Sequence, residues 1–169
     1  MKPKRLAALG LLTGLALILF IVEAQIPPLV PIPGVKIGLA NIVTVFAVFL
    51  MGAKDGALIL TARIFLGAVF AGNFSSIFYS AGGGIFAILA VIGLKKVLQE
   101  KQIWIAGCLG AVAHGIGQMT VAVPISGTPS ILIYLPVLIV TGIITGTFTG
   151  LCAQVLVNRG GSLWKTIFK

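Results

Sequence analysis

Acidic residues are nearly absent from this chain. Its 169 residues include three acids, Glu23, Asp55 and Glu100, with one histidine and two cysteines. A single aspartate cannot form the acidic cluster that binds magnesium with a diphosphate. The sequence also has no P-loop and no nucleophile with a neighbouring base. We therefore do not expect this chain to be an enzyme on its own, and we expect no metal site.

Charge of either sign is scarce, whereas apolar residues are abundant. Only 9% of the residues are charged, 59% are hydrophobic, and the mean hydropathy is +1.17. This composition indicates one membrane domain over residues 1–169, with the lipid bilayer as its surroundings. The formal net charge of +9 does not indicate nucleic acid binding, because the basic residues lie at the ends of apolar runs. The first 25 residues resemble a signal peptide, but the run 6–22 is long enough to span a membrane.

Six apolar runs predict an all-α integral membrane protein with six transmembrane helices. Within a bilayer, backbone groups are satisfied in helices or in closed barrels, and these runs lack the alternation of barrel strands. The expected helices are approximately 6–22, 36–52, 56–72, 81–94, 103–121 and 132–157.

Basic residues predict the orientation of this bundle. With six crossings, every basic cluster falls on one side: Lys2, Lys4 and Arg5; Lys54; Lys95, Lys96 and Lys101; Arg159, Lys165 and Lys169. The positive-inside rule makes that side cytoplasmic, so both termini are expected in the cytoplasm. The outer connections are then 23–35, 72–80 and 122–130, which are nearly uncharged and rich in Pro, Ser, Gly and Asn. We expect the binding face there.

Two polar residues begin the second predicted helix. Lys36 opposes the helix dipole, so it either forms an anion-attracting corner with the free amides or extends to lipid phosphates. Asn41 lies more than one turn deeper, where an unpaired amide is costly. It either bonds a neighbouring helix or faces a ligand.

Arg63 is the formal charge that lies well inside a predicted span, where a charged residue needs a partner. Candidate partners are Asp55, Glu23 and backbone carbonyls freed at glycine-rich turns. A structural clamp and a ligand contact are both consistent with this position.

His114 and Gln118 share one face of the fifth predicted helix because they are four residues apart. They either line a pocket or form an interhelical pair. One histidine cannot make a bis-histidyl haem, and no acid nearby suggests zinc. Glycines flank this pair and begin the fourth helix, allowing a helix or a ligand to approach the backbone: Gly107, Gly110 and Gly117; Gly82, Gly83 and Gly84.

Small residues recur every fourth position in two helices. In the sixth they form two ridges, which predict close packing with threonines hydrogen-bonding across the contact: Thr141, Thr145 and Thr149; Gly142, Gly146 and Gly150. In the first helix, Gly10 and Gly14 form either a packing face or a docking face for another membrane protein.

Four segments together resemble the Gx transporter family, whose older label is heptaprenyl diphosphate synthase component I. They are PGVKIGLANIVT (33–44), RIFLGAVFAGNFSSIFYSAGGG (63–84), GAVAHGIGQM (110–119) and YLPVLIVTGIITGTFTG (134–150). The resemblance implies a relative of the substrate-binding S-components of energy-coupling-factor (ECF) transporters, in a bacterial cell membrane. Such proteins have six helices, both termini inside, and a ligand site near the outer face under the loop between helices 1 and 2.

The resemblance also implies a ligand and partners. The ligand is a small amphipathic molecule, such as an isoprenoid or quinone precursor or another vitamin-like compound. We expect it to contact Lys36, Asn41, Arg63, Asn73, Ser80, Gly83, His114, Gln118 and Tyr134. A separate transmembrane coupling subunit and ATPases would supply the energy. The chain departs from the pattern in helix 1, where Ala7 and Ala8 lack alanine partners and Gly10 and Gly14 would substitute, and at Gly115, where the family often has asparagine.

Two other functions fit the sequence. One is a membrane component of extracellular electron transfer, which passes electrons to an extracytosolic flavoprotein through a bound quinone or flavin and has no covalent cofactor. The other is a non-catalytic partner of a prenyl diphosphate synthase.

Overall fold

Six α-helices make up most of the computed structural model, which describes residues 3–26, 38–72 and 74–168, with side chains as far as residue 161. They are α1 Pro3–Gln25, α2 Leu39–Leu50, α3 Ala53–Ala71, α4 Ser75–Lys95, α5 Ile103–Ser126 and α6 Leu135–Phe168. Two 3-10 helices, η1 Glu100–Gln102 and η2 Pro129–Tyr134, precede α5 and α6. The described residues contain no strand, and the all-α prediction is confirmed.

Four helical segments are long and apolar enough to cross a membrane: Pro3–Gln25, Ser75–Lys95, Glu100–Ser126 and Pro129–Gly161. These segments indicate a membrane-embedded protein. α2 is apolar but has only 12 residues, and α3 carries three charged residues, Lys54, Asp55 and Arg63. Six membrane crossings therefore stay a prediction.

Two expected connections are partly helical. α4 already begins at Ser75, inside the expected connection 72–80, and α5 continues through Pro124 to Ser126, inside the expected connection 122–130. Gly72 and Gly127, both with positive φ, end α3 and α5. Glycine accepts that left-handed conformation without strain. Serine and proline content misplaced both boundaries: Ser75, Ser76 and Ser80 belong to α4, and Gly127 rather than Pro124 ends α5.

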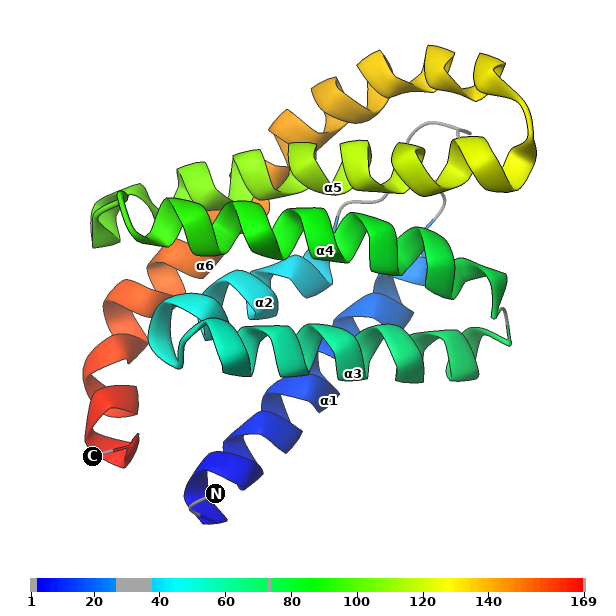
Figure 1. The fold of residues 1–169 in the computed structure, drawn as a ribbon. Helices are drawn as coiled ribbons and strands as arrows, with labels where there is room; N and C mark the ends of the chain where they lie inside the picture. The colour runs from blue at the N-terminus through cyan, green and yellow to red at the C-terminus, as the bar shows by residue number, and fades with distance from the viewer. Residues whose placement is uncertain (1–2, 27–37, 73, 169) are drawn as a thin grey trace.

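α5 packs between α4 and α6 through glycines (Figure 1). A Cβ atom at Gly107 would collide with the backbone of Gly150 in α6, and one at Gly117 would collide with the carbonyl oxygen of Gly82 in α4. The predicted close packing of the α6 glycine ridge is confirmed, and its partner is α5.

α2 lies inside the bundle and is held at both ends by charged side chains. The Glu23 carboxylate of α1 accepts hydrogen bonds from the backbone N–H groups of Gly38 (2.6 Å) and Leu39 (2.9 Å). At the other end, the Lys95 ammonium of α4 donates to the carbonyl oxygen of Val48 (2.5 Å). An anion at the N-terminus and a cation at the C-terminus both complement the helix dipole.

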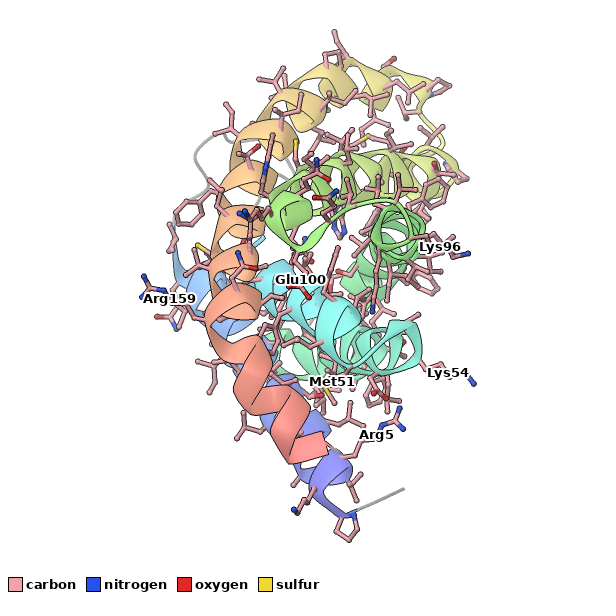
Figure 2. The ribbon with its side chains drawn as sticks, turned by 90° about the vertical axis from the view of Figure 1, so that its left-hand side faces the viewer. Arg5, Met51, Lys54, Lys96, Glu100 and Arg159 are labelled. Atoms are coloured by element: carbon pink, nitrogen blue, oxygen red, sulfur yellow. The ribbon has the colours of Figure 1, made fainter. Side chains whose placement is uncertain are left out.

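The basic residues gather at one end of the molecule. The first turn of α1, the last turn of α6 and the turns α2–α3 and α4–α5 all lie toward this end (Figure 1). Figure 2 shows the molecule with this end toward the viewer and labels Arg5, Lys54, Lys96 and Arg159. Arg5 donates two short hydrogen bonds to the buried Asp55, at 2.7 Å and 2.8 Å from Nη2. This grouping fits the predicted orientation, and the cytoplasmic assignment remains a prediction.

Candidate functional site

A polar cavity of about 90 Å³ lies between the helices, away from the basic end. All six helices contribute to its wall. Its polar lining residues are Glu23, Asn41, Arg63, Ser80, His114, Gln118, Thr141, Thr145 and Thr149. A polar cavity in an apolar bundle marks a functional site, because polar groups at membrane depth are costly unless they have a use.

Five of the predicted site residues meet at this cavity: Asn41, Arg63, Ser80, His114 and Gln118. Gly83 lies directly behind it. A Cβ atom at Gly83 would lie 2.7 Å from His114 Nε2 and 2.9 Å from Gln118 Cγ. The missing side chain therefore lets α4 approach the His114–Gln118 face of α5.

Arg63 is buried, with 8% of its surface exposed. Its Nε has no hydrogen-bond partner among the residues that the structure describes. The guanidinium carbon lies 5.9 Å from the centroid of the Phe20 ring, within the range of a cation–π contact. Asp55, one expected partner, instead pairs with Arg5. Glu23 acts on Arg63 electrostatically, so the charge is attracted but not tied into a clamp.

Glu23 lines the cavity although sequence analysis named it only as a candidate partner of Arg63. Only 6% of its surface is exposed, and its two oxygens accept the first amides of α2. The anion-attracting N-terminus expected near Lys36 is therefore already occupied by a carboxylate of the chain itself. Lys36 and Asn73 lie outside the described residues. The available signal was a lone acid at the end of an apolar run, which needs a partner in the fold.

The threonine ridge of α6 faces the cavity. Thr141 Oγ1 donates to the carbonyl oxygen of Val137 (2.7 Å), and Thr145 Oγ1 donates to that of Thr141 (2.9 Å). Thr149 Oγ1 bonds Gly146 in the same way (3.3 Å). The expected hydrogen bonds across a helix contact are therefore wrong. The hydroxyl protons are already used, so these side chains offer lone pairs to the cavity.

Three other predicted residues lie elsewhere. Tyr134 is exposed in η2 and does not line the cavity. No described atom lies within 4 Å of a Cβ placed at Gly10 or Gly14. Of the two uses expected for that glycine face, packing within the described chain is therefore excluded.

A second, much smaller space of about 10 Å³ continues from the polar cavity. Asn41 and Ala111 line both spaces. Thr44 Oγ1 is buried here and has no hydrogen-bond partner within the described part of the chain. The space is near the lower limit for one water molecule, so it can hydrate this hydroxyl but cannot hold a ligand.

The cavity wall offers groups that can recognise a small molecule. Among the described residues, no group of three His, Cys, Asp or Glu side chains could hold a metal ion. What the wall presents is one guanidinium, a capped carboxylate, amides, an imidazole and hydroxyl oxygens. These groups can select a small polar molecule by charge and hydrogen bonding.

The sequence profile of the family described as heptaprenyl diphosphate synthase component I matches residues 12–156. The chain belongs to this family. The match includes every residue that lines the cavity and agrees with the resemblance seen in the sequence. No curated protein and no solved structure matches the chain. The family description names one component of a synthase and does not assign catalysis to that component.

Proposed function

We propose that this family member is the substrate-binding membrane subunit of an ECF-type transporter. It takes up a small amphipathic molecule, such as an isoprenoid or quinone precursor or another vitamin-like compound, from the outer face. The observation that carries this proposal is the polar cavity, to which every helix of an apolar bundle contributes a side chain. Such convergence favours binding, because ligand sites occur between the helices of bundles and carry a few convergent polar groups.

The position of the cavity supports uptake from outside. It lies away from the basic end, which the positive-inside rule places in the cytoplasm. Glu23 and Gly38, which flank the connection between α1 and α2, both line it. The family resemblance implies that this connection covers the ligand site, with Lys36 as an expected contact; residues 27–37 lie outside the described part of the chain.

Energy coupling requires other chains, since this one has no P-loop. A transmembrane coupling subunit with its ATPases is the proposed partner. The α1 face around Gly10 and Gly14 is free for this contact within the described structure. Replacing Gly10 by leucine should block uptake without changing ligand binding.

Binding is tested on the full chain in lipid nanodiscs, by mass spectrometry of the small molecules that it retains. We expect one compound at near-stoichiometric amounts in the wild type. It should be lost from Ser80→Leu, which places an apolar side chain in the cavity wall. Thr120→Leu is the matched control, because Thr120 is exposed on α5 and bonds only the carbonyl oxygen of Ile116. Equal retention by both variants, or no retained compound in any sample, would contradict a binding function.

The family description favours a second candidate, a non-catalytic partner of a prenyl diphosphate synthase. It predicts that synthase activity falls when this chain is removed and returns when it is added back. The electron-transfer alternative predicts a quinone or flavin in the retained material, which a stoichiometric flavin absorbance spectrum would reveal.

A further inference from the structure

The charge balance of the cavity limits which ligand it can accept. Arg63 and Glu23 are the charged side chains that line it among the described residues, one a cation and the other an anion. Glu23 is already satisfied by two backbone N–H groups. Arg63 has five N–H donors, and its Nε has no hydrogen-bond partner among the described residues.

A ligand that pairs with Arg63 therefore adds one negative charge without loss of another contact. A diphosphate would add two or more charges to a wall that has a single cation among the described residues, and uncompensated buried charge is strongly unfavourable. A neutral ligand can accept hydrogen bonds from the guanidinium, but these are weaker than those to an anion. The charges at this site favour a monoanion, and a planar carboxylate matches the guanidinium fork best.

The part of the wall formed by α6 presents hydrogen-bond acceptors instead of donors. Thr141 and Thr145 have donated their protons to carbonyl oxygens of α6, so they can only accept. A ligand atom that contacts them must be a hydrogen-bond donor, because two acceptors facing each other in a buried site are destabilising.

The volume sets the size of the recognised group. About 90 Å³ is well below the ~300–1,000 Å³ of pockets that bury a whole drug-sized ligand. The cavity therefore suits a compact ligand or the head group of a longer one.

From these three observations we propose that the cavity recognises a monocarboxylate that also carries a hydrogen-bond donor, such as a hydroxyl group. The carboxylate lies on Arg63 and the donor points toward Thr141 and Thr145. This inference rests on the proposed binding function and names the ligand class for that same site. It favours hydroxy-acids as ligands over isoprenoid diphosphates, the compounds named in the family description.

The test combines two measurements on the full chain in nanodiscs. The first identifies the retained compound by mass spectrometry, and we expect a carboxylic acid with at least one hydroxyl or N–H group. The second compares thermal stabilisation by L-lactate, propanoate, lactamide and inorganic diphosphate at equal concentrations. L-lactate should stabilise most and propanoate less, since propanoate lacks the donor. Lactamide and diphosphate should have no effect.

Variants assign the effect to the two walls. Arg63→Gln should weaken L-lactate binding about tenfold to a hundredfold, and Thr141→Val or Thr145→Val by a few-fold. Arg159→Gln is the charge control, because Arg159 is exposed and points away from the helices (Figure 2). Thr147→Val is the hydroxyl control, since Thr147 makes the same bond within α6, to Ile143, but does not line the cavity. Arg63→Gln should also keep or raise the unfolding temperature of the ligand-free protein, whereas a structural role for Arg63 would lower it.

The outcomes distinguish this inference from the proposed function. A retained neutral compound or diphosphate, or equal stabilisation by lactamide and L-lactate, overturns the ligand class and leaves a binding function intact. No retained compound and no stabilisation by any probe contradicts both.

Discussion

Glu23 and Arg63 are opposite charges buried at the same cavity, with different surroundings. The Glu23 carboxylate accepts two backbone N–H groups at the start of α2, which offset the cost of removing it from water. Arg63 has the Phe20 ring and the field of Glu23, and its Nε has no hydrogen-bond partner among the described residues. These surroundings fit a stabilising role for Glu23 and the proposed binding role for Arg63.

Glu23→Gln should destabilise the protein by about 1–2 kcal/mol, because it keeps an acceptor at the start of α2 but loses the charge that complements the helix dipole. Glu23→Leu should cost more, since both amides then lack a partner. Thermal unfolding of the ligand-free protein measures both changes. If the leucine variant is as stable as the wild type, the capping role is excluded.

Glycine contacts hold α5 between its two neighbours. Gly107 meets the backbone of Gly150 in α6, and Gly117 meets Gly82 in α4. Backbone cannot move aside as a flexible side chain can, so these contacts fix the distances from α5 to α4 and to α6. His114 and Gln118 lie on α5, and the threonine ridge lies on α6. The cavity depends on that separation.

Gly107→Ala should lower the free energy of unfolding by about 1–3 kcal/mol, because its Cβ would overlap the Gly150 backbone. Gly93→Ala in α4 is the matched control. No described atom lies within 4 Å of a Cβ at Gly93, so alanine there should stabilise the helix by up to about 1 kcal/mol. Thermal denaturation of both variants gives the comparison. Similar shifts for the two would show that the α5–α6 contact is looser than described.

Lys95→Met should destabilise the protein by about 1 kcal/mol, because the carbonyl oxygen of Val48 loses its donor at the C-terminal end of α2. Lys96→Met removes the same charge from a neighbouring side chain that is exposed and points away from the helices (Figure 2). It should leave stability unchanged within about 0.5 kcal/mol. Equal losses in chemical denaturation would show that net charge, and not the hydrogen bond, is responsible.

Across the whole molecule, charge and cavity lie at different ends. The basic residues gather at the end of the molecule that faces the viewer in Figure 2, and the cavity lies away from that end. α2 is about 18 Å long at 1.5 Å per residue, shorter than the ~30 Å hydrocarbon core of a bilayer. If the C-terminal end of α2 lies at the interface on the basic side, its N-terminus and Glu23 lie within the hydrocarbon core and do not reach the other membrane surface.

The predicted orientation can be measured with single cysteines, after Cys108 and Cys152 are replaced by serine and alanine. A membrane-impermeant maleimide should label Ser126→Cys in intact cells, and should label Lys54→Cys and Lys96→Cys only after permeabilisation. This pattern follows from the positive-inside rule. Labelling of Lys96→Cys in intact cells would exclude six crossings with both termini inside.

Much of the site could be predicted because its signals are local. His114 and Gln118 are polar residues one turn apart in an apolar run, and Arg63 is a charge within another such run. The place of Glu23 in the cavity wall was missed because its partners, Gly38 and Leu39, lie 15 and 16 residues away, beyond what periodicity can connect. The threonines of α6 were assigned to packing, because sequence alone does not show that their bonds stay within the helix.

The sequence by itself determined that the chain is helical, apolar and asymmetric in charge, since composition and hydrophobic runs act through the solvent and not through particular contacts. Only the tertiary structure decided which acid pairs with which base. Asp55 pairs with Arg5 and Glu23 caps α2, whereas Arg63 lines the cavity and its Nε has no hydrogen-bond partner among the described residues. Which charges pair depends on how the six helices pack against one another. Glycine contacts between residues far apart along the chain set the packing of α5 against α4 and α6.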